Sequence, residues 1–300
     1  MDIVTHAMSG LIIAAPLAPT APLSASAFLL GSVVPDIDML VRCFGKLRFL
    51  RSHQTYTHAL PVIVLAAVLC WPVLGWLGAD EPWAPLVLAA GLIVHSLMDM
   101  TNTYGVALFA PLGRRRFNLD WIFFIDAPLM AASVLALVPT VLSLWGAWPV
   151  RAWPAIAYGG FLAAYWPVRW AIRRRAWRLS PEGTRSLVPS SLTPWRFHGL
   201  AVAGQRARLF DLNAVTGAIA NDSERPLFDR RYQPWLEKVA EYRLMRDLSV
   251  GYYASDACQQ DGEMTILCAD LRTRNFGGRY GMLEMTFDSQ GNVRRKLLHV

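Results

Sequence analysis

Long apolar blocks alternate with short polar ones over the first 176 residues of the chain. Two early blocks, residues 7–18 and 24–34, are separated by Pro19-Thr-Ala-Pro22 and are shorter than the roughly 20 residues that a membrane-spanning helix needs. Four later blocks approach or reach that length: residues 59–78, 84–100, 122–147 and 153–172. The pattern predicts an α-helical integral membrane domain, in which a short N-terminal helical hairpin precedes four spanning helices.

The remainder, residues 177–300, contains no such block and predicts a separate, small α+β domain. Apolar residues at roughly helical spacing indicate a helix over residues 233–248. Residues 264–272, 281–287 and 293–300 read as strands, with turn residues over 288–292. We therefore expect two domains, with bounds 1–176 and 177–300.

Composition and charge support a membrane location. Hydrophobic residues make up 54% of the chain and charged residues 17%, where soluble domains have about 25% charged residues. The net charge of +7 could suggest nucleic acid, but no basic-aromatic recognition motif accompanies it. Instead the arginines flank the apolar blocks, at residues 42–51, 114–116 and 173–175. The positive-inside rule then predicts a multi-pass membrane protein whose C-terminal domain is cytoplasmic.

Histidines and aspartates recur at the ends of these apolar blocks. His95 and Asp99 are four residues apart, so a helix presents both on one face. Imidazole and carboxylate together bind divalent metals and, without thiolates, are typical of catalytic rather than structural sites. The four cysteines show no C-x-x-C spacing. The candidate metal ligands are His6, Asp36, Asp38, His53, His58, His95 and Asp99.

Each cluster also has a simpler interpretation. His95 and Asp99 could be a polar pair that joins two helices, and Asp36 and Asp38 could lie in a solvated loop. Either His53 or His58 alone could be an interfacial residue; for the pair we expect His53 in a turn and His58 at a helix start, with Thr57 available as a cap. Asp126, beside the third long block, is a candidate outer partner that orients a histidine.

The order of these motifs resembles a known family. Thr5-His6, Pro35-Asp36-Ile-Asp38, His53-x-x-x-Thr57-His58 and His95-x-x-x-Asp99-x-x-Asn102-x-Tyr104-Gly105 are similar to the YdjM-like inner-membrane metal-dependent hydrolases, described as LexA-regulated in enteric bacteria. The resemblance covers roughly residues 1–130. It implies a membrane hydrolase distantly similar to the zinc-dependent phospholipase C and P1 nuclease group. The family often has Arg after the first histidine of its His-Arg-x-x-Thr-His-Ser motif, where this chain has Gln54, and Ala59 replaces the following Ser.

We therefore expect an enzyme that cleaves a phosphoester or other ester of a lipid-like substrate at the cytoplasmic face, by means of a metal-activated water. Zinc is the expected ion, with manganese or iron as alternatives, and Asp36, Asp38 and Asp99 are the candidate catalytic carboxylates. The alternative function is a non-enzymatic metal-binding membrane protein or a scaffold whose cytoplasmic domain recruits a partner. Metal content and hydrolysis in variants of the same residues discriminate between the two.

Overall fold

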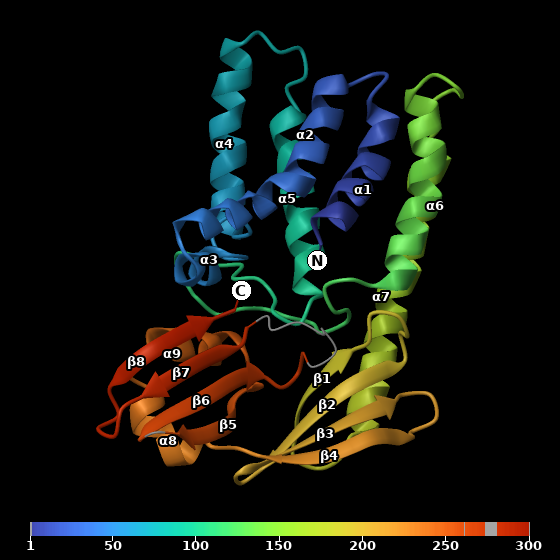
Figure 1. Ribbon diagram of the computed structural model, residues 1–300. Coiled ribbons are helices and arrows are strands. Elements are labelled where there is room, and N and C mark those ends of the chain that lie inside the picture. The colour runs from blue at the N-terminus through green and yellow to red at the C-terminus, as the bar shows by residue number, and fades with distance from the viewer. Residues whose placement is uncertain (1, 261, 274–280, 300) are drawn as a thin grey trace. The chain divides into compact units, whose positions relative to one another are not determined.

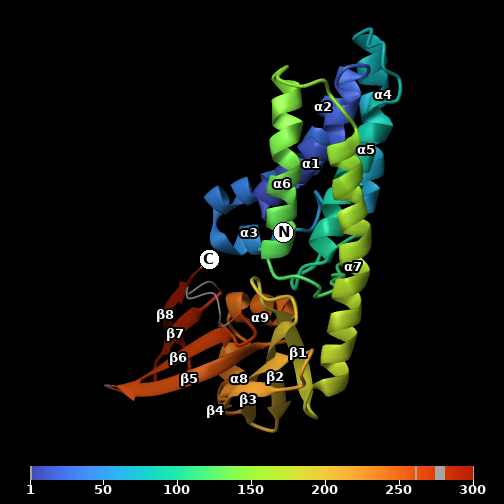
Figure 2. The same ribbon diagram turned by 90° about the vertical axis from the view of Figure 1, so that its right-hand side faces the viewer.

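The computed structural model describes residues 2–260, 262–273 and 281–299 (Figures 1 and 2). The chain divides into two compact units. The first consists of Met1–Ala171 with Ser191–Pro194, and the second of Ile172–Ser190 with Trp195–Val300. The first unit is helical, and the second is built mainly from strands.

An aspartate cap or an early proline marks the start of several helices in the first part of the chain. The helices up to residue 179 are, in chain order, α1 (Ile3–Ala14), η1 (Ala15–Leu17), α2 (Pro22–Val33), η2 (Val34–Phe44), α3 (Lys46–Ser52), α4 (Leu60–Trp76), α5 (Ala84–Met100), α6 (Ala127–Leu144) and α7 (Trp153–Leu179), where η marks a 3₁₀ helix. Helix α7 begins in the first unit, and its residues from Ile172 on belong to the second. Asp2 caps α1 by accepting the backbone N–H of Thr5 at 2.9 Å, and Asp126 caps α6 by accepting that of Leu129 at 3.1 Å. Proline opens α2, α4, α5 and α6, where its missing N–H costs no helical hydrogen bond.

Two glycines let α2 and α5 pack backbone to backbone. A Cβ on Gly31 would lie 2.4 Å from the Leu88 carbonyl oxygen, and a Cβ on Gly91 would lie 2.4 Å from that of Phe28. The main core of this unit is formed by side chains of α1, α5, α6, α7 and the segment before α6: Ile12, Met98, Ile122, Leu129 and Tyr158. The close helix pair holds α2 and α5 together, and this core joins α1 and α5 to α6 and α7.

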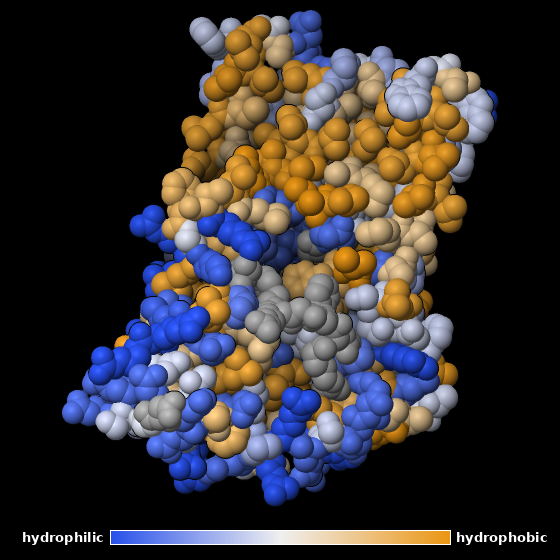
Figure 3. Space-filling view, viewed as in Figure 1, coloured by the Kyte–Doolittle hydropathy of each residue, from blue (hydrophilic) through white to orange (hydrophobic). Residues whose placement is uncertain are grey.

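The prediction of four spanning helices is wrong. Among the described residues only α6, with 18 residues, is both long and apolar enough to cross a membrane. Helices α4 and α5 have 17 residues each, which is about 26 Å at roughly 1.5 Å per residue, short of the roughly 30 Å hydrocarbon core. Arg169 and Arg173–Arg175 interrupt the apolar run of α7. Hydrophobic residues nevertheless cover much of the visible surface of the helical unit (Figure 3).

The run predicted over 59–78 is shortened at both ends by local backbone geometry. Ala59 is extended and Pro61 stands in the first turn of α4, so the helix cannot start earlier. After Trp76 the chain turns at Gly78, whose φ of 67° lies in the left-handed region that glycine tolerates. A count of apolar residues cannot detect these boundaries.

The second unit contains two antiparallel four-stranded sheets, with strand orders β1-β2-β3-β4 and β5-β6-β7-β8. The strands are β1 (Thr184–Pro189), β2 (Arg196–Ala203), β3 (Arg206–Asn213), β4 (Ile219–Pro226), β5 (Tyr252–Gln260), β6 (Glu263–Asp270), β7 (Leu283–Phe287) and β8 (Val293–Leu298). One face of the first sheet packs Phe197, Phe210 and Leu212 against Ala176 of α7. Helices α8 (Asp229–Leu236) and α9 (Ala240–Leu248) connect the two sheets.

The strand predictions for 264–272, 281–287 and 293–300 correspond to β6, β7 and β8, although Val300 lies outside the described residues. The helix predicted over 233–248 is instead the end of α8 and the whole of α9. Strands β1 to β5 were not predicted, so the second unit holds considerably more sheet than the sequence pattern indicated.

Candidate metal centre

Four buried side chains converge in the helical unit: Asp36 of η2, His58 just before α4, and His95 and Asp99 of α5. One ligand atom from each lies within 4.8 Å of the others. His58 Nε2 is 3.1 Å from His95 Nε2 and 3.1 Å from Asp99 Oδ2, while Asp36 Oδ1 is 3.6 Å from His95 Nε2 and 4.0 Å from His58 Nε2. Tetrahedral ligands about 2.0–2.1 Å from zinc stand about 3.3 Å apart. The four atoms therefore fit around one small divalent ion with modest adjustment.

Hydrogen bonds on the far side of both histidine rings direct their lone pairs into this cluster. His95 Nδ1 donates to the backbone carbonyl of Ser32 at 2.8 Å, which leaves Nε2 without a proton in the neutral ring. The single hydroxyl hydrogen of Thr57 is donated to Asp38 Oδ2 at 3.2 Å, so Thr57 accepts from His58 Nδ1 at 3.0 Å. The two Nε2 lone pairs then face each other at 3.1 Å, an arrangement that requires a proton or a cation between them.

The carboxylates of the cluster are suited to a positive charge. Burial alone would raise the pKa of Asp36. Protonated His95 donates a hydrogen bond to Asp36 and carries a positive charge beside it, and together these lower the pKa of Asp36 below its usual value. A bound cation acts in the same direction. Asp36 Oδ2 is buried and has no hydrogen-bond partner among the described residues, so this oxygen remains open to a further ligand or proton.

His6 lies directly beside the four ligands but outside the group that could share one ion. Its Nε2 is 3.0 Å from Asp99 Oδ1, and its ring stacks on His95 with the ring centroids 3.8 Å apart. The other oxygen of Asp99 accepts from the side-chain amide of Gln54 at 3.0 Å. His6 and Gln54 therefore hold Asp99 in position rather than joining the convergent set.

Asp38 and His53 form a neighbouring pair. His53 Nδ1 is 2.7 Å from Asp38 Oδ1, and Asp38 Oδ2 accepts from the Gln54 backbone N–H at 2.8 Å as well as from Thr57. Both oxygens of Asp38 are thus engaged by protein donors. The structure places Asp38 as an outer carboxylate that orients two histidines, His53 directly and His58 through Thr57.

The turn between α3 and α4 brings these groups together. Its central residue, Gln54, has a φ of 56°, the left-handed conformation that few non-glycine residues adopt. Arg116 holds the turn by donating to the carbonyls of His53 at 2.6 Å and Gly105 at 3.1 Å. His53 lies in this turn, as predicted, but α4 has no side-chain cap, and Thr57 bonds to His58 instead.

Several residues of this arrangement were not among the candidates. The Ser32 carbonyl and Arg116 carry no motif signal, and Gln54 stood out only as a departure from the resembled family. Asp126, suggested as a partner of a histidine, instead caps α6 and accepts from the Tyr165 hydroxyl at 2.6 Å. Its other oxygen is 3.7 Å from the buried guanidinium of Arg169.

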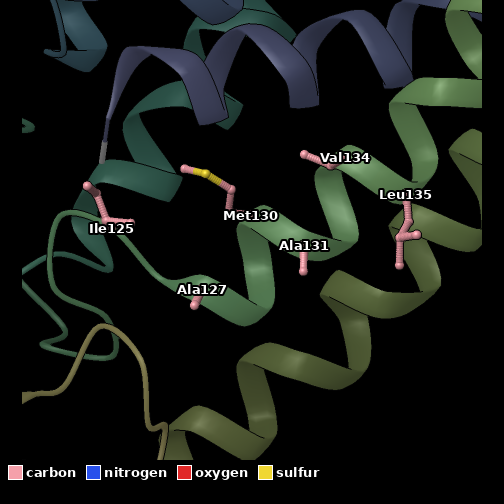
Figure 4. Close-up of a pocket in the computed structure, with 6 residues that line it drawn as sticks. All are labelled: Ile125, Ala127, Met130, Ala131, Val134 and Leu135. Atoms are coloured by element: carbon pink, nitrogen blue, oxygen red, sulfur yellow. The ribbon is translucent and has the colours of Figure 1, made fainter.

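A shallow apolar groove of about 540 Å³ runs along α6 (Figure 4). All of its lining residues are hydrophobic, five from α6 and one from the segment before it: Ile125, Ala127, Met130, Ala131, Val134 and Leu135. The groove offers no group for acid–base chemistry or for metal binding, so the polar cluster remains the candidate for any reaction.

Comparison with known proteins identifies the first 176 residues. An uncharacterized protein of Bacillus subtilis (strain 168), YfhP, is 24% identical over 225 residues, which is 69% of this chain and 66% of that protein, slightly less than two thirds of its length. No solved structure matches the chain. The sequence model of the family described as YdjM inner membrane protein matches residues 1–176, the part that contains the whole Asp/His cluster. The chain therefore belongs to the YdjM inner membrane protein family.

Proposed function

We propose that the protein is a metal-dependent hydrolase of the inner membrane that cleaves a phosphoester or other ester of a lipid-like substrate. The observation that carries the proposal is the convergence of Asp36, His58, His95 and Asp99 with the two imidazole lone pairs directed at each other. A divalent ion held by such a set supplies Lewis acidity that activates water for attack on an ester. Zinc suits the mixed imidazole and carboxylate donors, as do manganese and iron.

The chain's own residues divide into ligands, orienting groups and a proton acceptor. Ser32 and Thr57 fix the two histidine rings, and His6 with Gln54 fixes Asp99. Asp36 Oδ2, buried and without a hydrogen-bond partner among the described residues, is the carboxylate oxygen best placed to accept a proton from water. Asp38, whose oxygens are both engaged, is the weakest of the three catalytic candidates.

A second function is supported by the burial of the site. His58, His95 and Asp99 are fully buried and Asp36 is 4% exposed. Closed sites with four protein ligands are typical of structural metals, whereas catalytic sites keep one position open. A non-enzymatic metal-binding protein is therefore the competing proposal, and hydrolysis requires a movement that admits the substrate.

Both functions require that the cluster binds a metal ion, and metal analysis of the detergent-purified full-length protein tests this. We expect bound divalent metal in the wild type and its loss in His58→Ala, His95→Ala and Asp99→Ala. His198→Ala is the matched control, because His198 lies on β2 and pairs with Asp211 there. Unchanged metal content in the His95 and Asp99 variants would rule out the site.

Hydrolysis assays on phospholipid vesicles, with the metal-loaded protein, separate the two functions. Release of a headgroup or fatty acid that depends on the bound metal and is lost in Asp36→Asn supports the enzyme. A protein that keeps its metal and turns over no phosphoester or carboxylester lipid supports the structural role. We further propose that the site opens to the cytoplasmic face, which cysteine accessibility in oriented vesicles measures.

A further inference from the structure

The segment that supplies Asp36, η2, has two opposite faces. In a 3₁₀ helix, residues three apart fall in one row. The row Val34, Ile37, Leu40 and Cys43 is exposed along its whole length, with Ile37 at 55% and Leu40 at 62%. Pro35, Asp36 and Asp38 are buried on the other side, next to the metal centre.

Toward its C-terminal end η2 is exposed on its other two rows as well: Met39, three residues after Asp36, is 48% exposed, and Phe44, six residues after Asp38, is 70% exposed. Isolated exposed apolar residues need no explanation, but a contiguous set on one short element marks an interaction surface.

The charges around this face all have the same sign. Arg42, Lys46, Arg48 and Arg51 are exposed, whereas the acidic residues of 34–52, a stretch that the structure describes completely, are the buried Asp36 and Asp38. An apolar face bordered by basic residues is the composition of segments that lie in the interfacial layer of an anionic membrane.

We propose that the outer face of η2, with the basic start of α3, lies in the headgroup layer of an anionic bilayer. The apolar row enters the boundary of the acyl chains, and Arg48 and Arg51 contact lipid phosphates. This deepens the proposed function, because the segment that binds lipid on one side carries Asp36 on the other. The metal centre would then lie at the depth of the ester and phosphate groups of a lipid substrate.

Two exposed cysteines provide a matched test on the full-length protein: Cys43 in the exposed row and Cys258 on β5. An environment-sensitive fluorophore is attached to Cys43 in a Cys70→Ser, Cys258→Ser background, or to Cys258 in a Cys43→Ser, Cys70→Ser background. Both proteins are reconstituted in phosphatidylcholine vesicles with and without phosphatidylglycerol. We expect the label on Cys43 to shift its emission to the blue and to be quenched by brominated lipids, more so with phosphatidylglycerol, while the label on Cys258 shows neither effect.

A second pair of variants tests the charge contribution. Arg48→Glu with Arg51→Glu should reduce the blue shift in phosphatidylglycerol vesicles to its value in pure phosphatidylcholine. Leu40→Ser, at an exposed position, should weaken the lipid quenching and leave the metal content unchanged.

The contrary outcomes are distinct. If iodide quenches the label on Cys43 as readily as the label on Cys258, the proposal that this face lies in the membrane is overturned. Rapid disulfide formation between the Cys43 residues of two copies also overturns it, because the face would then serve self-association. A wild-type protein without metal overturns the proposed function but leaves the fluorescence result intact.

Discussion

The backbones of Gly31 and Gly91 meet where α2 packs against α5 (Figure 1), with the Cα of Gly31 3.1 Å from the position that a Gly91 Cβ would occupy. The next residue after Gly31 is Ser32, whose carbonyl accepts the Nδ1 proton of His95. The glycine contact therefore sets the distance between a helix that orients a ligand and the helix that carries it.

Replacing Gly91 with alanine should disturb both packing and metal binding. The added methyl group would stand 2.4 Å from the Phe28 carbonyl oxygen, so α2 and α5 must separate. We expect a loss of about 1–3 kcal/mol in the free energy of unfolding. Since the Ser32–His95 bond is an outer contact of a ligand, metal affinity should fall roughly 10- to 100-fold. Thermal unfolding and competition with a chelator measure the two effects.

Gly160→Ala is the control for that substitution. Gly160 lies in α7, and its Cβ position has no heavy atom within 4 Å. Alanine there should stabilise the helix by about 0.5–1 kcal/mol and leave metal affinity unchanged. Equal changes in stability and in metal affinity for Gly91→Ala and Gly160→Ala would show that the α2–α5 contact does not position the metal ligands.

Gln54 combines a strained backbone with a contact to a ligand, and two variants separate these contributions. Gln54→Gly and Gln54→Ala both remove the amide that donates to Asp99, so each should lower metal affinity about tenfold. Glycine accepts the φ of 56° without steric cost, so the Gly variant should be more stable than the Ala variant by about 1 kcal/mol. If the metal affinity of the Gly variant were higher than that of the Ala variant, in step with its greater stability, the role assigned to the amide would be contradicted.

The candidate ligands could be recognised from the sequence because each lies at the end of an apolar block. Sequence spacing could not separate ligands from orienting groups, because that depends on which atom faces the centre. His53 and His58 belong to one motif, yet the left-handed turn at Gln54 directs His58 into the cluster and His53 toward Asp38. Left-handed backbone at a glutamine has no signature in hydrophobic periodicity.

The sheets were underestimated for a related reason. Strand β4 (Ile219–Pro226) is exposed along its whole length and pairs with β3 through backbone and charged side chains, including Arg208 with Asp222. Such a strand shows no alternation of apolar and polar residues, so its identity comes from its partner and not from its own sequence.

Arg116 should behave differently from its neighbour Arg114. The guanidinium of Arg116 bridges the His53 and Gly105 carbonyls, whereas the side chain of Arg114 is exposed. We expect Arg116→Ala to cost roughly 2–3 kcal/mol of stability, as for hydrogen bonds from a charged donor, and to weaken metal binding by loosening the 53–58 turn. Lysine should not restore either property, because a single ammonium cannot reproduce the planar fork. Thermal unfolding should show Arg114→Ala within about 0.5 kcal/mol of the wild type. Equal losses of stability in Arg114→Ala and Arg116→Ala would show that the two hydrogen bonds of Arg116 do not stabilise the turn.

The buried pair Asp270 and Arg272 should make the stability of the second unit dependent on acid. Burial opposes ionisation of Asp270, but the charge and hydrogen bonds of Arg272 hold its pKa below the usual value. A carboxyl group with a lowered folded-state pKa stabilises the fold fully above its unfolded value of about 3.9, and this contribution is lost as the pH falls through the lower folded value. Asp270→Asn should remove that dependence and cost roughly 3–5 kcal/mol at neutral pH, because it removes the carboxylate that lies 2.9 Å from the guanidinium of Arg272 where both side chains are buried.

Cys268 provides the measurement for this pair. It is buried on β6, two residues from Asp270, and burial raises the pKa of its thiol, so it reacts only when the strand opens. The urea concentration at which a dithiodipyridine reagent modifies Cys268 should fall below pH 4 in the wild type, and should be lower at pH 7 in Asp270→Asn. Asp222→Asn, which changes an exposed pair on the other sheet, should leave the midpoint at its wild-type value. A midpoint that is independent of pH in the wild type would mean that the ion pair does not stabilise this sheet, because protonation of Asp270 would then cost nothing.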